Sequence, residues 1–300
     1  MRVLVTGGAG FVGSHVVDAL LARGDEVHVV DDLSTGSREN VAAGAQFHEL
    51  DIREPGVEAL GAEIKPDVIL HLAAQADVGT SVERPVFDAE VNVLGTVRVL
   101  EAARAAGAHV VFTSSGGAIY GECTEPATEE HPRLPVSPYA VSKLAGEEYL
   151  AGWNRLHRTS HVALRLANVY GPRQRPALEG GVVAIFLDRL SRGDTVDIYG
   201  DGAQVRDFVH VSDVAAAFLR AAEQGEGVYN VGTGVATSVL ELYNLCAAAA
   251  GSDLEPNFAD ARPGDLRRSV IDASRAEREL GWRPETPLAD GIARTLEQLS

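Results

Sequence analysis

The segment RVLVTGGAGFVGSHVVDALLARGDEVHVVD, residues 2–31, carries the clearest fold signal in the chain. Arg2–Thr6 is a short apolar run typical of a buried strand, and Ser14–Arg23 repeats its apolar residues at helical spacing. The glycine-rich Gly7–Gly13 joins these two pieces, and Glu26–Asp31 is a second apolar run. A strand, a glycine loop, a helix and another strand within about thirty residues predict a parallel βαβ unit.

The glycine spacing in this unit is typical of a dinucleotide-binding turn. Gly8, Gly10 and Gly13 satisfy G-x-G-x-x-G, and Gly7, Gly10 and Gly13 also satisfy G-x-x-G-x-x-G. Glycine lets the backbone turn tightly and approach a pyrophosphate at the start of the following helix. Asp31 ends the second strand, where a carboxylate binds the ribose 2′-hydroxyl and repels a 2′-phosphate. The unit therefore predicts NAD, rather than NADP, as the cofactor.

Strands and helices continue to alternate up to about residue 167. We expect further strands at Gln46–Leu50, Val68–Leu72, Val110–Thr113 and Val162–Leu166, and long helices at Val86–Ala106 and Tyr139–Leu156. The alternation predicts an α/β fold with a Rossmann-type doubly wound parallel sheet. Glycine and proline break the later pattern into short pieces. We therefore expect an NAD-binding domain over residues 1–167 and a smaller C-terminal α/β substrate-binding region over 168–300, with some later segments returning to the first domain.

Composition narrows the classes of function. The chain has 26 Lys and Arg against 43 Asp and Glu, a formal net charge of −17, which disfavours nucleic acid and anionic membrane as partners. Its apolar runs are shorter than the roughly 20 residues that span a bilayer. Cys123 and Cys246 lie far apart without metal-ligand spacing, so we expect no metal and a reduced compartment. The first residues read as a strand rather than a signal peptide, so we expect a cytoplasmic protein.

Ser137–Lys143 reads SPYAVSK and is the first candidate for chemistry. If this segment opens a helix, Tyr139 and Lys143 share one face, one turn apart. A nearby ammonium favours the phenolate, so the pair predicts a proton acceptor for a sugar or alcohol hydroxyl. The same spacing also fits a half-buried tyrosine beside a solvated lysine, and the pair alone does not decide between them.

Other candidates follow the expected strands, because ligands bind at the carboxyl ends of strands in a doubly wound sheet. Thr113–Gly117 reads TSSGG and offers hydroxyls to the substrate oxygen, or else forms a turn without chemistry. His71–Ala74 ends in small residues suited to packing against a dinucleotide, and His71 itself is interpreted as a histidine at the core edge. Asp51 and Ile52 either contact adenine or open a turn.

These motifs resemble the extended short-chain dehydrogenase/reductase family over essentially the whole chain. The resemblance extends to the nucleotide-sugar epimerases, especially those that interconvert UDP-glucose and UDP-galactose. The later motifs that carry it are Asn168–Arg173 (NVYGPR), Gly202–Val211 (GAQVRDFVHV), Tyr229–Gly232 (YNVG) and Arg262–Asp265 (RPGD).

The resemblance implies specific roles. NAD would be held tightly and not consumed, by Gly7, Gly10, Phe11, Val12, Gly13, Asp31, Asp32, Ser34, Thr35, Gly36, Asp51, Ile52, Leu72, Ala73, Ala74, Gln75, Asn92, Ser114, Tyr139 and Lys143. Tyr139 would be the general base and acid, Lys143 would lower its pKa and bind the nicotinamide ribose, and Ser115 would share the substrate oxygen. The segment before Tyr120 is one residue longer here than is usual in the family, so Ser114 is the alternative catalytic hydroxyl.

The implied substrate site contains Ser115, Tyr139, Asn168, Val183, Arg206, Arg262, Asp265 and Ser269. Asn168 would hold the diphosphate of a UDP-sugar, Arg206 and Arg262 would clamp its charges, and Asp265 would bind the uridine ribose. Each arginine alone also fits a surface ion pair. In the resembling epimerases a small residue four positions after this aspartate accompanies acceptance of N-acetylated sugars, so Ser269 implies that UDP-N-acetylhexosamines are accepted as well.

The implied reaction is 4-epimerisation through a transient 4-keto sugar. Relatives that dehydrate or decarboxylate sugar nucleotides carry an acidic residue where this chain has Gly116 and Gly117, which favours epimerisation. The alternatives are a 4-epimerase of a UDP-uronic acid or dTDP-sugar, a dehydratase or decarboxylase, and a non-catalytic NAD-binding regulator. The resemblance also implies a homodimer, formed by the Tyr139 helix and the helix at Val86–Ala106. The Val, Leu and Ala residues of the latter helix fit a dimer face and a buried internal face equally well.

Overall fold

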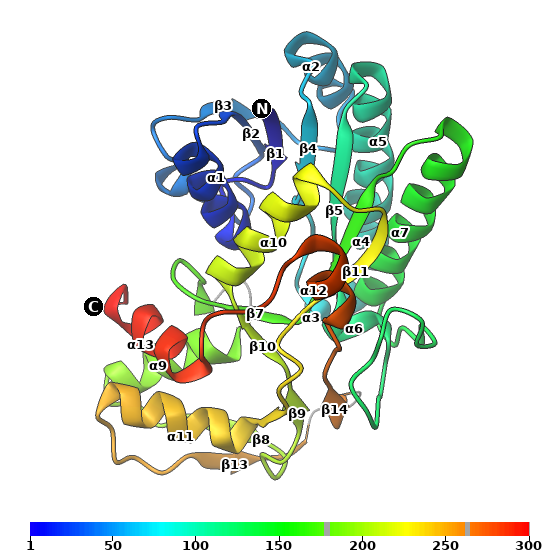
Figure 1. Cartoon of the computed structure of the whole chain (residues 1–300). Helices are drawn as coiled ribbons and strands as arrows, with labels where there is room; N and C mark the ends of the chain where they lie inside the picture. The colour runs from blue at the N-terminus through cyan, green and yellow to red at the C-terminus, as the bar shows by residue number, and fades with distance from the viewer. Residues whose placement is uncertain (177–180, 262–264, 300) are drawn as a thin grey trace.

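The computed structural model describes residues 1–176, 181–261 and 265–299, and in these ranges its largest sheet has seven parallel strands (Figure 1). From one edge to the other the strands follow the order β11-β6-β5-β4-β1-β2-β3. Their bounds are β1 (Arg2–Thr6), β2 (Glu26–Asp31), β3 (Gln46–Glu49), β4 (Val68–His71), β5 (His109–Ser115), β6 (Val162–Leu166) and β11 (Gly227–Val231). This main sheet is the doubly wound parallel sheet that the sequence predicts, which confirms the fold class.

Helices cover both faces of the main sheet. One face carries α1 (Phe11–Arg23) and α10 (Val211–Glu223), and the other carries α2 (Gly56–Ile64), α5 (Gly95–Ala106) and α7 (Pro138–His157). In β1, Val3 and Val5 belong to the core beneath α1 and α10, whereas Leu4 belongs to the core on the opposite face. Side chains alternate along a strand, so burial of both faces requires a nearly continuous apolar run.

The helix expected at Val86–Ala106 is not continuous. It consists of α4 (Pro85–Ala89), a wide π turn η2 (Glu90–Leu94) and α5, preceded by the short α3 (Val78–Glu83). Asn92 lies in the π turn, where its side chain accepts from Gln75 N (2.9 Å) and donates to Gln75 O (2.9 Å). This long-range pairing accompanies the wider turn, and a local apolar pattern does not reveal it. Single π turns occur frequently at functional sites.

Short elements form the remainder of the chain. The helices are η1 (Arg38–Asn40), α6 (Gly116–Ile119), α9 (Val182–Ser191), α11 (Val239–Ala250), α12 (Ser274–Leu280) and α13 (Leu288–Glu297). The strands are β7 (Asn168–Tyr170), β8 (Asp197–Tyr199), β9 (Val205–Arg206), β10 (Phe208–His210), β12 (Thr237–Ser238), β13 (Asn257–Ala259) and β14 (Arg268–Ser269).

Much of this later part has a core of its own. Residues of α9, α11 and α13 build it, including Phe186, Leu242 and Ile292, and Figure 1 shows these helices grouped at the carboxyl end of the main sheet. β11 instead pairs with β6 in the main sheet, so one later segment does return to it. The division of the chain at residues 167 and 168 stays a prediction.

Candidate active site

The glycine loop between β1 and α1 has the close backbone approach that a dinucleotide site needs. Gly7 has a φ of +72°, and a Cβ added to it would lie 2.5 Å from Ala73 N. A Cβ on Gly13 would lie 2.0 Å from Gly7 O. Gly10 precedes α1 and has no side chain to cap it, so the first turn has no side-chain cap and its N–H groups can bind an anion. The loop therefore fits a pyrophosphate.

Asp31 lies at the carboxyl end of β2, beside this loop. Its Oδ2 accepts from Ala9 N (3.0 Å), and its Oδ1 accepts from Leu33 N (2.9 Å). Burial raises the pKa of Asp31, and the nearby Asp32 adds to the rise, while the two backbone donors oppose it. The buried carboxylate is thus fixed in orientation, as a residue that recognises a ribose hydroxyl must be.

The other predicted cofactor residues border the same edge of the main sheet. Asp32, Ser34, Thr35 and Gly36 form the loop after β2, in which Asp32 Oδ1 accepts from Ser34 N (3.0 Å). Leu72, Ala73, Ala74 and Gln75 follow β4 and lie half-buried.

Asp51 and Ile52 differ in their surroundings. Asp51 is paired with Arg53 (Nη2 to Oδ2, 2.5 Å), which lowers the pKa of Asp51. Ile52 is buried against Gly95, where an added Cβ would lie 2.6 Å from Ile52 Cδ1.

Tyr139 and Lys143 lie on one face of α7. Ser137 caps this helix by accepting from Ala140 N (3.2 Å), and Pro138 occupies the first turn, where proline is favoured. Lys143 Nζ lies 5.9 Å from the centre of the Tyr139 ring and donates to Thr113 O on β5 (3.0 Å). The lysine is buried, which lowers its pKa to about 8. It is therefore not the solvated lysine of the alternative interpretation.

The pKa of Tyr139 is raised in this structure. Burial is the largest cause, Asp88 adds to it, and a hydrogen bond with the Ser115 side chain opposes it. The sequence leads us to expect a pKa lowered by Lys143, so the net direction is the opposite of that expectation. The physical reason is that burial disfavours the charged phenolate.

The structure distinguishes the two serines at the end of β5. Ser115 is the serine whose side chain lies close enough to Tyr139 to lower the pKa of its phenol. Ser114 is buried, and its hydroxyl donates to Glu147 Oε1 (2.5 Å). Successive residues of a strand point to opposite faces, so only one of the two can meet the tyrosine. This geometry favours Ser115 over the alternative Ser114.

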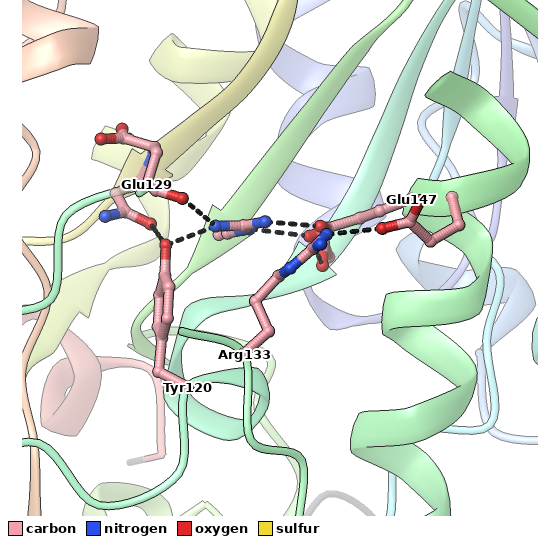
Figure 2. Close-up of polar contacts among 8 residues, drawn as sticks. Tyr120, Glu129, Arg133 and Glu147 are labelled. Carbon is pink, nitrogen blue, oxygen red and sulfur yellow. Dashed lines mark hydrogen bonds and ion pairs between the residues drawn. The ribbon is translucent and has the colours of Figure 1, made fainter. Parts of the chain in front are cut away.

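Ser114 is hydrogen-bonded to a buried network that the sequence does not predict, and Figure 2 shows Tyr120 and Glu147 within it. Glu147 on α7 and Arg165 on β6 form a bidentate pair, with Nε to Oε1 at 2.9 Å and Nη2 to Oε2 at 2.7 Å. Arg165 also donates to the Tyr120 hydroxyl (2.7 Å), which donates in turn to Asn230 Oδ1 on β11 (2.7 Å). Burial raises the pKa of Tyr120 to about 12, so it remains a donor. The network joins α7, β5, β6 and β11 around the Tyr139 site.

A cavity of about 550 Å³ opens in the later part of the chain. Four predicted substrate residues line it: Asn168, Val183, Arg206 and Asp265. Arg206 Nη2 lies 2.5 Å from Asp265 Oδ1, so these two residues form an ion pair. Arg262 lies outside the described residues. The volume is in the usual range for a small-molecule site.

Residues between the cavity and β5 connect the two candidate regions. Ser269 on β14 is buried, and its hydroxyl donates to Gly117 O (3.2 Å). A Cβ on Gly117 would have Asn168 Nδ2 as its nearest neighbour, at 3.7 Å. A Cβ on Gly116 would lie 2.9 Å from Ile271 Cδ1 and 3.1 Å from Arg165 O, so a side chain at position 116 would require Ile271 to move.

Asp207 is a further buried residue whose role the sequence motif did not reveal. It directly follows Arg206, and Asp207 O accepts from Asn168 Nδ2 (3.1 Å). Its carboxylate accepts from Thr233 N (2.9 Å), Thr233 Oγ1 (2.6 Å) and Gly234 N (3.0 Å), just past β11. Asp207 therefore links the cavity wall to the edge strand of the main sheet.

Residues 1–176, 181–261 and 265–299 lack the features of two other site classes. No group of three or more His, Cys, Asp or Glu side chains in these ranges is placed to hold a metal ion. None of the helices in these ranges has the length and apolar character needed to cross a bilayer.

His71 is buried between Thr6 Oγ1 (2.7 Å) and Thr96 Oγ1 (3.0 Å), and burial lowers its pKa to about 3.

Comparison with known proteins gives close matches. Residues 3–232 match the NAD dependent epimerase/dehydratase family. The UDP-glucose 4-epimerase of Mycolicibacterium smegmatis is 51% identical over 306 residues, covering 99% of this chain and 98% of that protein. A UDP-glucose 4-epimerase structure from Thermotoga maritima with UDP-glucose has a TM-score of 0.97 and 44% identity, covering 99% of this chain and 98% of that one. The Thermus thermophilus UDP-glucose 4-epimerase complex with NAD has a TM-score of 0.95 and 49% identity, with coverage of 100% and 99%.

Proposed function

Because the chain belongs to the NAD-dependent epimerase/dehydratase family, we propose that it catalyses 4-epimerisation of a UDP-sugar, with UDP-glucose and UDP-galactose as the principal pair. The observation that carries the proposal is the group formed by Ser115, Tyr139 and Lys143 at the end of β5. This group lies on the carboxyl side of the main sheet, together with a glycine loop that fits a pyrophosphate. The identity and full-length coverage of the UDP-glucose 4-epimerases support the choice of UDP-sugar.

In the proposed reaction the side chains handle the proton. The chemistry that NAD supplies when bound is the reversible acceptance of a hydride from carbon 4 of the sugar. Tyr139 takes the proton of the 4-hydroxyl as the 4-keto sugar forms, and it returns that proton to the oxygen when the opposite epimer forms. Ser115 hydrogen-bonds the same oxygen, and Lys143 supplies a positive charge that favours the phenolate. Proton transfer of this kind contributes roughly 10²–10⁴-fold to a rate.

The proposed cofactor contacts follow the geometry of the sheet edge. Gly7, Gly10 and Gly13 place the backbone against the pyrophosphate, and the start of α1 faces its charge. Asp31 binds the adenosine ribose, and its carboxylate disfavours a 2′-phosphate. Lys143 is also proposed to contact the nicotinamide ribose.

The cavity is proposed to take the nucleotide end of the substrate. Arg206 is held by Asp265 and by its own contact to Val205 O (2.9 Å), and its remaining N–H groups are available for a diphosphate. Asn168, at the cavity edge nearest Gly117, is placed between the diphosphate and the sugar. Fixed N–H donors of this kind would let a chain with a net charge of −17 hold an anionic diphosphate.

Epimerisation is favoured over dehydration by the two glycines after Ser115. Elimination requires an acid or base beside the sugar in addition to Tyr139. Glycine occupies positions 116 and 117, and a larger side chain at position 116 would require Ile271 to move. The alternative substrates for a 4-epimerase are a UDP-uronic acid and a dTDP-sugar.

Ser269 supports a wider substrate range. Its small side chain contacts Gly117 O, next to the proposed sugar position. We therefore propose that UDP-N-acetylglucosamine is also epimerised. Assay of UDP-glucose, UDP-N-acetylglucosamine, UDP-glucuronic acid and dTDP-glucose at equal concentration tests the proposal. Turnover of the first two supports it, and turnover of UDP-glucose without UDP-N-acetylglucosamine contradicts the wider range. Turnover of only the third or fourth contradicts the proposed UDP-glucose and UDP-galactose pair.

The surface supports a homodimer. Val86, Leu94, Val141 and Leu156 are each more than half exposed, and they lie on α4, η2 and α7. Packing these helices against their copies in a second chain would bury the four side chains. Light scattering at low micromolar concentration tests the dimer.

The two cysteines of the chain, Cys123 and Cys246, are buried and free, which supports placing the enzyme in the reduced cytoplasm.

A further inference from the structure

Asp88 is a buried carboxylate that the proposed reaction does not use. It lies on α4 with 1% of its surface exposed. Its Oδ1 accepts from Gln75 Nε2 (2.9 Å) and from Asn92 Nδ2 (3.0 Å). Its Oδ2 is buried and has no hydrogen-bond partner among the described residues. A buried carboxylate with one unpartnered oxygen is costly unless a nearby positive charge stabilises it.

The structure places this carboxylate beside the Tyr139 helix. α4 and η2 pack against α7, and Asn92 connects them by donating both to Asp88 Oδ1 and to Ser142 Oγ (3.1 Å). Ser142 directly precedes Lys143 and donates to Tyr139 O (2.9 Å). Asp88 is therefore positioned through Asn92 and Ser142 against the turn of α7 that carries both reactive side chains.

Asp88 is the counter-charge of Lys143, because the other groups beside the ammonium are uncharged or already paired. His71 on β4 faces the ammonium but is neutral at physiological pH, because burial lowers its pKa to about 3. From β5 the ammonium meets the uncharged Thr113 carbonyl. Glu147, one turn further along α7, is neutralised by Arg165 on β6. Asp88 is the charged group that acts on both Lys143 and Tyr139.

The groups around Asp88 itself do not neutralise it. Gln75 and Asn92, its hydrogen-bond partners, are uncharged. Arg84 on the same chain segment is exposed and stacks on Phe87 at 4.3 Å from the ring centre. Asp77, in the loop after Gln75, uses its carboxylate to cap α3 by accepting from Thr80 N (2.7 Å). Lys143 is the buried cation on which the Asp88 charge acts.

Resting on the proposed function, we propose that Asp88 is a positioning residue whose carboxylate keeps Lys143 protonated beside Tyr139 and so sets the pH range of the reaction. The same carboxylate favours protonated forms of both partners. Removing its charge therefore moves the ionisation of the pair toward lower pH. A merely structural residue would instead lower activity equally at all pH values.

The titration of Lys143 can be measured directly, because Lys65 and Lys143 are the two lysines of the chain and Lys65 is exposed. Carbon-13 labelling at the lysine ε position gives one signal for each in the purified protein with the nucleotide it retains. In Asp88→Asn, whose amide keeps an acceptor for Gln75 and Asn92, the Lys143 signal is expected to titrate about one pH unit lower or more than in the unmodified protein. The Lys65 signal is expected to be the same in both proteins.

Two further variants complete the test. Asp77→Asn is the matched control, since it removes a neighbouring carboxylate and keeps the cap of α3, and it is expected to leave the Lys143 titration unchanged. Asp88→Ser removes the charge without placing an amide there, and it replaces Asp88→Asn if that variant does not fold. An unchanged Lys143 titration in a folded Asp88 variant overturns the proposal, with or without turnover.

Turnover gives the second readout. In Asp88→Asn the ratio of kcat at about pH 8.5 to kcat at about pH 6.5 is expected to fall roughly tenfold, the change that one pKa unit produces. The KM for UDP-glucose is expected to change little. A shifted Lys143 titration in a protein that epimerises no nucleotide sugar would overturn the proposed function and leave the role of Asp88 standing.

Discussion

Ser114 donates a 2.5 Å hydrogen bond to Glu147 Oε1 on α7, the same helix that carries Tyr139 two turns earlier. This bond fixes the end of β5 against the helix and directs Ser114 away from the tyrosine. Ser115, the next residue, is then the hydroxyl that meets Tyr139. The two adjacent serines thus have different tasks, one in positioning the strand and one at the reacting oxygen.

Replacing the two serines separately tests this assignment. Ser115→Ala is expected to lower kcat about tenfold to a hundredfold, the loss that follows when a hydrogen bond to a charged group disappears. Ser114→Ala is expected to lower kcat less and to reduce the free energy of unfolding by about 1–3 kcal/mol, because Glu147 loses a buried donor. Steady-state kinetics and urea unfolding measure the two effects. A larger kcat loss in Ser114→Ala than in Ser115→Ala would contradict the assignment.

The Glu147–Arg165 pair should dominate the stability of this region. Glu147→Gln leaves the Arg165 charge buried without its partner, and the expected loss in unfolding free energy is about 3–5 kcal/mol. Glu148→Gln is the matched control on the next residue, where the ion pair with Arg133 at 2.6 Å is exposed and contributes about 0–1 kcal/mol. Urea unfolding of both variants checks the difference. Equal losses in unfolding free energy would show that the buried pair contributes no more to stability than the exposed pair.

Tyr139 is the proposed proton carrier, so its hydroxyl is the group to remove. Tyr139→Phe is expected to lower kcat by roughly 10²–10⁴-fold while the protein still binds NAD, because the ring remains and the proton acceptor is lost. Tyr149→Phe is the control, since Tyr149 lies on the same helix and is exposed. Epimerase assays and the nucleotide content of the denatured proteins report the two properties. Full activity in Tyr139→Phe would rule out this tyrosine as the base.

Much of the fold follows from local patterns. The apolar runs predict the six strands β1 to β6 with ends that differ by no more than a few residues, and the glycine spacing identifies the turn after β1. The edge strand β11 is less visible, because YNVG resembles a short piece of a later domain rather than a return to the main sheet. The π turn at Asn92 depends on a pairing with Gln75, seventeen residues earlier. The helical spacing of apolar residues gives no information about such a long-range contact.

The site was predicted in part. The spacing of Tyr139 and Lys143 correctly placed both on one face of a helix. The choice between Ser114 and Ser115 needed the orientation of β5, because both are small hydroxyl residues in one run. The Glu147–Arg165 pair was missed since charged residues are usually exposed. A signal was nevertheless present: Glu147 lies at helical spacing from Lys143, on the face that α7 buries. The sign of the Tyr139 pKa shift also required burial, which no motif encodes.

In the proposed reaction, carbon 4 of a UDP-sugar loses and regains the same hydrogen within one site. Incubation of UDP-glucose carrying deuterium at carbon 4 in ordinary water, followed by proton NMR of the product, tests it most directly. The expected product is UDP-galactose that retains the deuterium at carbon 4, because the hydride returns without exchange with solvent. UDP-galactose with hydrogen at carbon 4, or no UDP-galactose at all, would contradict it.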